Sequence, residues 1–254
     1  EGDKVLQLVN DTDNNVFNGD IGFIKSIATI NSPYKKEIVS NFIRLINSQL
    51  EYIPLGSQLS ILQEDYRKAG FDKKRFNRFY SDDYIEGFID NQTFIKMCDL
   101  HIQNRTGTGK NRHTEEIFQG IFAHTKCGKD IKTYIKISNN KLKLLKKSDR
   151  VELDSEEFEK YFDIYSENKI VTMQLLTSDI MESLVAFHNM YNLNYEIVFR
   201  NNSIYLRFFT GAMFEPKIFG SSMDKQLLFT YFCILKFIVD VSKKVNKTLQ
   251  EIEV

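Results

Sequence analysis

The 254-residue sequence predicts an α+β fold, in which antiparallel sheets pack with several helices, including a long C-terminal helix. Three observations lead to this prediction. Segments in which apolar residues alternate with polar ones are grouped between residues 83 and 147. Segments with helical periodicity lie before and after this group, and a long one closes the chain. Strands and helices that are grouped along a chain are typical of the α+β class.

The first 31 residues predict a small β segment of their own. Apolar residues from Val5 to Val9 lead into the turn sequence NDTDNN, and Asn18-Gly19 is a second turn signal. We therefore expect two domains, a small β segment at residues 1–31 and an α+β domain at residues 34–254.

Two helices are predicted next. The first covers residues 34–50, with Ser32 as its cap. The second is short: Ser60 and Gln63 form a capping-box pattern, and Gly70 stands where a helix should stop. The first helix has one apolar face, formed by Ile38, Phe42, Leu45 and Ile46.

Five strands are predicted between residues 83 and 147. Turn sequences such as Asp90-Asn91 and Asn139-Asn140 separate them, so they should form hairpins in an antiparallel sheet. The five segments read DYIEGFID, TFIKMCDLHI, EIFQGIFAHT, IKTYIKIS and KLKLLKK.

The last third of the chain predicts a mixture of elements. A short helix should follow Ser155, and the β-branched segment IVTMQLL (170–176) should be a strand. A hairpin is expected around Asn201-Asn202, and a long helix over residues 223–249. An amphipathic helix over 178–192 should point four side chains inward: Ile180, Leu184, Val185 and Phe187.

Composition limits the possible functions. The chain has 34 basic and 34 acidic residues, so no overall field attracts it to nucleic acid or to an anionic membrane. Its three cysteines, Cys98, Cys127 and Cys233, fit a reducing compartment, and we expect a cytoplasmic location. The longest apolar run, Leu227–Val241, is interrupted by charges and is shorter than the roughly 20 residues that span a membrane.

The sequence predicts no catalytic residues, no metal site and no cofactor. The loop RTGTGKN has Asn104 and Asn111 where a phosphate-binding loop needs a glycine and a hydroxyl. His124 and Cys127 lack the second pair of ligands that a zinc site requires, and we expect His124 to be a surface residue of a strand. His188 should form one hydrogen bond at the edge of the core. The acidic pairs Asp82-Asp83 and Glu156-Glu157 should be solvated.

Basic residues are concentrated between residues 101 and 150, where twelve Lys or Arg face four Asp or Glu. The favoured interpretation is a solvated sheet face on which lysines prevent edge aggregation. The alternative is a surface for a protein or an anionic membrane; nucleic acid is less favoured, because few aromatic residues accompany the charges. The lysines concerned are Lys132, Lys136, Lys141, Lys143, Lys146 and Lys147.

The opening stretch GDKVLQLVNDTDNNVFNGDIGFI (2–24) resembles the SH3-like segment of RecD-type DNA helicases. The likeness covers less than a tenth of the chain, and no Walker motif or other motor motif follows it. It implies an accessory fragment that binds nucleic acid.

Residues 34–245 resemble a bacterial family known as domain of unknown function 3137, also labelled galanin-like. The likeness is carried by segments such as DDYIEGFI (82–89), EEIFQGIFAH (115–124) and IVFRNNSIYLRF (197–208). The resemblance implies a domain without an assigned reaction, attached to the inner face of a membrane by segments outside this chain. We therefore expect a non-catalytic binding or scaffolding module, in which Glu86 and Glu215 bond to backbone amides at strand ends. A helicase-derived fragment and an undetected hydrolase are the alternatives.

Overall fold

The computed structural model describes residues 4–6, 21–23, 39–55, 59–72, 74–108, 111–139, 150–213 and 225–252. These residues form an α+β fold, as predicted. The strands are β1 (Lys4–Leu6), β2 (Ile21–Phe23), β3 (Leu50–Leu55), β4 (Arg78–Phe88), β5 (Phe94–Thr106), β6 (His113–Lys126), β7 (Tyr134–Ser138), β8 (Arg150–Val151), β9 (Asp163–Ser166), β10 (Tyr195–Arg200) and β11 (Ser203–Phe208). The helices are α2 (Ser40–Ile46), α3 (Leu59–Ala69), α4 (Glu156–Tyr161), α5 (Lys169–Leu175), α6 (Ser178–Tyr191) and α7 (Lys225–Glu251).

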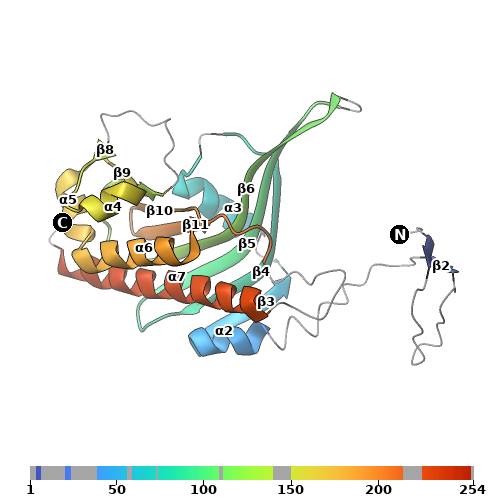
Figure 1. Ribbon diagram of the computed structural model, residues 1–254, viewed down its shortest axis with the longest axis horizontal. Helices are drawn as coiled ribbons and strands as arrows, with labels where there is room; N and C mark the ends of the chain where they lie inside the picture. The colour runs from blue at the N-terminus through green and yellow to red at the C-terminus, as the bar shows by residue number, and fades with distance from the viewer. Residues whose placement is uncertain are drawn as a thin grey trace.

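One antiparallel sheet of nine strands organises the domain. Its order is β3-β4-β5-β6-β11-β10-β7-β9-β8, so the hairpin of β10 and β11 is inserted between β6 and β7. The β5–β6 hairpin is the longest in this sheet, and its far end extends beyond the helices (Figure 1). Asn201 has a φ of 54° in the tight turn between β10 and β11, which confirms the predicted hairpin.

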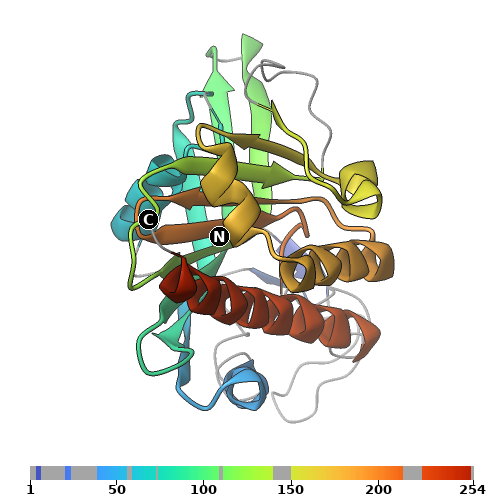
Figure 2. The same ribbon diagram turned by 90° about the vertical axis from the view of Figure 1, so that its left-hand side faces the viewer.

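Each face of the sheet has its own core, because successive residues of a strand point to opposite faces. On β10, Ile197 and Phe199 belong to the larger core, whereas Val198 belongs to the smaller one. Residues of α2, α4, α5, α6 and α7 complete the larger core, and α3 covers the other face (Figures 1 and 2).

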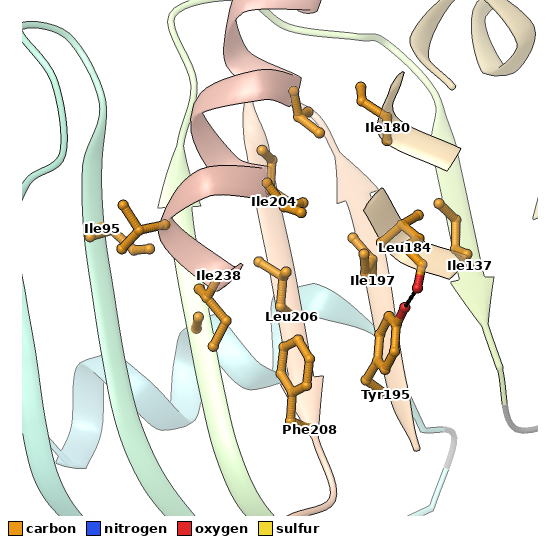
Figure 3. Close-up of a cluster of buried hydrophobic side chains, with 14 of the residues drawn as sticks. Ile95, Ile137, Ile180, Leu184, Tyr195, Ile197, Ile204, Leu206, Phe208 and Ile238 are labelled. Atoms are coloured by element: carbon orange, nitrogen blue, oxygen red, sulfur yellow. Dashed lines mark hydrogen bonds between the residues drawn. The ribbon is translucent and has the colours of Figure 1, made fainter. Parts of the chain in front are cut away.

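The larger core is aliphatic and aromatic (Figure 3). Leu184 and Ile180 of α6 and Ile238 of α7 pack on inward-facing residues of β10 and β11. The Tyr195 hydroxyl is buried there and donates a 2.8 Å hydrogen bond to the backbone oxygen of Leu184. This bond satisfies a polar group that would otherwise destabilise the core.

Several predicted elements are confirmed. Ser155 caps α4 by accepting from the backbone N–H of Phe158, and Gly70 ends α3 with a φ of 68°. The long C-terminal helix is α7. The four residues expected to point inward from α6 are its buried residues.

One predicted element has the wrong type, and two predicted helices exist with different ends. Residues 170–176 do not form a strand, because Lys169–Leu175 is helix α5. The helix expected at 34–50 ends at Ile46, where Asn47 adopts an extended conformation and leads into the unpredicted edge strand β3. Helix α3 begins at Leu59, one residue before the expected cap.

Two sequence predictions fall partly or wholly outside the described residues. In the N-terminal segment, β1 pairs antiparallel with β2, and the division into two domains stays a prediction. The segment KLKLLKK also lies outside them.

No single helix within the described ranges is long and apolar enough to cross a membrane. The pair α5 and α6 passes by length and composition, but its axes bend by 73°. Val171, Leu175 and Leu184 of this pair are buried in the larger core.

Candidate functional site

A cluster of buried charges lies on the α3 face of the sheet. Glu196 of β10 stands directly opposite Arg207 of β11, and Lys136 of β7 stands opposite Val198. Since Glu196 and Val198 share a face, all three charged side chains point toward α3. Their exposed fractions are 1%, 3% and 4% for Glu196, Arg207 and Lys136.

These groups form a continuous hydrogen-bonded network. Arg207 Nε donates to Glu196 Oε2 at 2.6 Å, and Lys136 Nζ lies 3.0 Å from Glu196 Oε1. Arg207 also forms a bidentate pair with Asp72, in which Nη2 lies 3.1 Å from Oδ1. The Tyr66 hydroxyl accepts from Arg207 Nη1 at 2.6 Å and lies 2.9 Å from Asp72 Oδ2. Two cations therefore balance two carboxylates, so that the network is neutral.

Aromatic rings enclose the guanidinium of Arg207. Its Cζ lies 4.6 Å from the ring centroid of Phe71, 5.1 Å from Phe209 and 5.6 Å from Phe118. Burial among these rings strengthens the ion pairs and makes an unpaired charge costly. Burial raises the pKa of the Asp72 carboxyl, but the hydrogen bonds and charge of Arg207 outweigh that effect, so its pKa is lowered overall.

The network opens to solvent in a pocket of about 400 Å³, which we call the basic pocket. Its wall continues from the buried Tyr66 and the half-buried Asp72 to exposed cations. Lys74 is paired with Glu115 at 2.5 Å, and the Arg67 guanidinium lies 5.0 Å from the ring centroid of Phe76. Arg75 is exposed and has no ion pair to another described residue. The basic pocket comprises Tyr66, Arg67, Asp72, Lys74, Arg75 and Phe76.

A second polar cluster lies on the same face. His124 Nδ1 is 3.0 Å from Asp65 Oδ2, and His124 Nε2 is 3.1 Å from Ser203 Oγ. This order of contacts is that of a Ser-His-Asp triad. However, Lys96 also pairs with Asp65 at 3.5 Å, and the His124 ring stacks on Tyr205 at 4.6 Å. Ser203 does not line the basic pocket.

The prediction of a solvated basic sheet face is wrong for one of its lysines, Lys136. Lys136 is buried in the network and is not part of a solvated surface, because its Nζ bonds to Glu196 and to the backbone oxygen of Phe71 at 3.1 Å. Lys132 is exposed. The other members, Lys141, Lys143, Lys146 and Lys147, lie outside the described residues.

Several further predictions can be compared with the structure. His188 bonds to Asn139 at 2.9 Å at the edge of the core, as expected. His124 is half-buried and was wrongly expected at the surface. The prediction for one carboxylate is also wrong. Asp83 was expected to be solvated, but it is fully buried and accepts a hydrogen bond from the Tyr52 hydroxyl. Among the described contacts, Glu86 accepts from the Tyr84 hydroxyl at 2.6 Å and from no strand-end amide, whereas Glu215 lies outside the described residues.

The metal prediction concerns described residues, and the phosphate prediction concerns a loop of which residues 109–110 lie outside the described ranges. Burial raises the pKa of the Cys127 thiol to about 12, which disfavours the thiolate that binds metals. Among the residues that the structure describes, no three His, Cys, Asp or Glu side chains are placed to hold a metal. The loop RTGTGKN joins strands β5 and β6, so no helix N-terminus follows it to hold a phosphate.

A family model described as a protein of unknown function (DUF3137) matches residues 116–247. The chain belongs to this family. The matched DUF3137 region contains Lys136, Glu196 and Arg207, whereas Tyr66 and Asp72 precede it. The family match therefore includes the three charged residues on the sheet but not the two residues from the α3 region that bond to them.

One solved structure is distantly similar to this DUF3137 protein. It is the mycobacterial trehalose monomycolate transport factor A, TtfA, which is 8% identical. The alignment covers 88% of this chain and 97% of that chain, with a TM-score of 0.47. A likeness at this level supports no inference about function.

Proposed function

We propose that this DUF3137 domain is a non-catalytic binding module and that the basic pocket holds an acidic segment of a protein partner. The observation that carries the proposal is the placement of Arg67 and Arg75 around a pocket whose inner wall is a neutral, fully bonded network. Because Asp72 is already paired with Arg207, it leaves the outer cations available to a ligand carboxylate.

The shape of the site favours a peptide over a membrane surface. The cations surround a recess that includes the ring of Phe76, and neighbouring Lys68 and Lys74 are paired with Glu64 and Glu115. A membrane surface requires a broad field of unpaired charge. Attachment to a membrane and a cytoplasmic location stay predictions from the sequence.

The test measures binding of a fluorescent peptide of Glu, Phe and Ser by anisotropy at two salt concentrations. The double variant Arg67→Gln/Arg75→Gln should weaken binding about tenfold, since two exposed pairs are lost. The matched control is Arg44→Gln/Arg112→Gln, which removes two exposed arginines elsewhere. Equal affinities of the two variants would contradict the proposal.

The same assay addresses the other partners. Vesicles of phosphatidylglycerol that bind in place of the peptide would favour an anionic membrane. Single- or double-stranded DNA that binds with a steep salt dependence would favour the helicase-derived alternative, since phosphate contacts release counterions.

The Ser203, His124 and Asp65 contacts favour a second candidate function, hydrolysis by acyl transfer. In that mechanism His124 Nε2 would take the Ser203 proton while Asp65 orients the imidazole. The test is labelling by a fluorophosphonate probe. Labelling that disappears in Ser203→Ala would support a hydrolase, and an unlabelled wild-type protein would exclude this candidate.

A further inference from the structure

A second pocket, on the other face of the sheet, has the opposite charge. Its volume is about 350 Å³, within the range of ligand pockets, roughly 300–1,000 Å³. Helices α4, α5 and α6 surround it at the end of the domain away from the projecting β5–β6 hairpin (Figure 1). We call it the acidic groove.

The inner surface of the acidic groove is apolar. Val185 of α6 is buried, and Leu153 and Met181 are half-buried beside it. Met173 of α5 is 43% exposed at the edge of the groove, and the neighbouring Ile170 is 71% exposed. Methionine side chains are flexible and adapt to apolar groups of different shapes.

Carboxylates line the rim. Asp154, Glu157 and Glu182 are all exposed, and none forms an ion pair with another described residue. Neighbouring carboxylates differ in this respect, because Glu159 and Asp163 both bond to Arg150 at 2.9 and 3.2 Å. The groove therefore combines an apolar floor with three carboxylates that form no ion pair to a described residue, which gives its rim negative charge.

We propose that the acidic groove is a docking site for a basic amphipathic segment of a partner protein. Such a segment places apolar side chains on the Met173 and Met181 surface, while its lysines or arginines meet Glu157 and Glu182. Charge complementarity selects this occupant over an acidic peptide or an anionic membrane, both of which the rim repels. The groove is separate from the basic pocket, so this inference does not depend on the proposed function.

The experiment uses a fluorescent amphipathic peptide of Leu, Lys and Ala and measures its anisotropy with the full chain. The variant Glu157→Gln/Glu182→Gln should weaken binding about tenfold at low salt. Met173→Asn should weaken binding at low and at high salt, because it removes apolar contact. The matched control, Glu51→Gln/Glu167→Gln, removes two exposed carboxylates outside the groove and should leave the affinity unchanged.

Three results would overturn the inference. One is the absence of peptide binding to the wild-type chain. Another is equal weakening by the rim variant and its control. The third is that a peptide of Lys and Ala alone binds as tightly as the peptide with Leu. Binding would then be due to charge attraction and not to apolar contact with the floor of the groove. Circular dichroism of each variant verifies that the fold is kept, and Arg67→Gln/Arg75→Gln should bind the basic peptide normally.

Discussion

In the charged network behind the basic pocket, the side chain of Arg207 bonds to three partners. It bonds to Glu196 of β10, to Tyr66 of α3 and to Asp72, which follows α3. A buried ion pair does not guarantee stability, since removing both charges can be neutral. Removing one partner is different, because it leaves the opposite charge buried without compensation.

We predict that Arg207→Met lowers the free energy of unfolding by about 3–5 kcal/mol. Lys136 still neutralises Glu196 in this variant, but Asp72 loses its bidentate partner and Tyr66 loses a donor. Urea denaturation followed by circular dichroism measures the loss. Arg200→Met is the matched control: Arg200 is an exposed residue of β10 that bonds only to the Lys68 backbone oxygen among the described contacts, so its loss should cost about 1 kcal/mol or less.

The ion pair could have been predicted from the sequence. Once Asn201-Asn202 is accepted as a two-residue turn, Arg200 pairs with Ser203, and the register places Glu196 opposite Arg207. In each strand a charged residue stands directly between two apolar ones, and this pattern is itself a signal. Asp72 and Lys136 could not be predicted as partners, because they reach the pair through tertiary packing of the α3 region and of β7.

Whether a helix or strand could be predicted depends on how strong its local sequence signal is. Helix α5 was predicted as a strand because Ile170 and Val171 are β-branched. Asn168 nevertheless caps the helix by accepting from the Val171 N–H at 3.2 Å. Val171, Thr172 and Leu175 are buried, at helical and not at alternate spacing, while Ile170 is exposed. The cap was the overlooked signal. Edge strand β3 has no comparable signal, because it is only six residues long and contains Pro54, a residue type that is uncommon inside strands.

The close approach of β6 and β11 depends on Gly120. Its φ is +148°, and a Cβ atom there would lie 2.0 Å from the Phe208 backbone oxygen and 2.7 Å from the Thr210 nitrogen. We predict that Gly120→Ala destabilises the fold by about 3 kcal/mol, since backbone atoms cannot move aside easily. Gly211→Ala is the control: its φ is +71° but nothing lies within 4 Å, so backbone strain of about 1 kcal/mol is expected. Thermal denaturation of both variants should rank Gly120→Ala as the less stable.

At the scale of the whole molecule, one sheet separates two cores of different chemistry. The larger core is apolar and could largely be predicted from helical and strand periodicity. The α3 face contains charged groups beside aromatic rings: Asp65, Glu196 and Arg207 are buried, and Asp72 is half-buried. Overall neutrality of the sequence concealed this arrangement, since the total charge does not reveal which ions are buried.

Acidification should therefore destabilise the domain by protonating the paired carboxylates on the α3 face. Burial raises the pKa of Asp65, but its hydrogen bond to His124 and the charges of His124 and Lys96 more than offset this, and the pKa is lowered, as it is for Asp72. A carboxyl with a lowered folded-state pKa stabilises the fold above its unfolded pKa, about 3.9, and this contribution is lost as pH falls toward the folded value.

We expect the urea midpoint to change little through these two groups between about pH 7 and pH 5 and to fall steeply below about pH 4. Asp72→Asn should be less stable at neutral pH and show a shallower fall, because the variant has already lost one of the titrating groups. Asp154→Asn, which alters an exposed carboxylate of the acidic groove, should keep the wild-type profile. An Asp72→Asn profile parallel to that of the wild type would show that the pair with Arg207 does not control acid stability. The acid sensitivity would then have to arise from carboxyls outside the buried network.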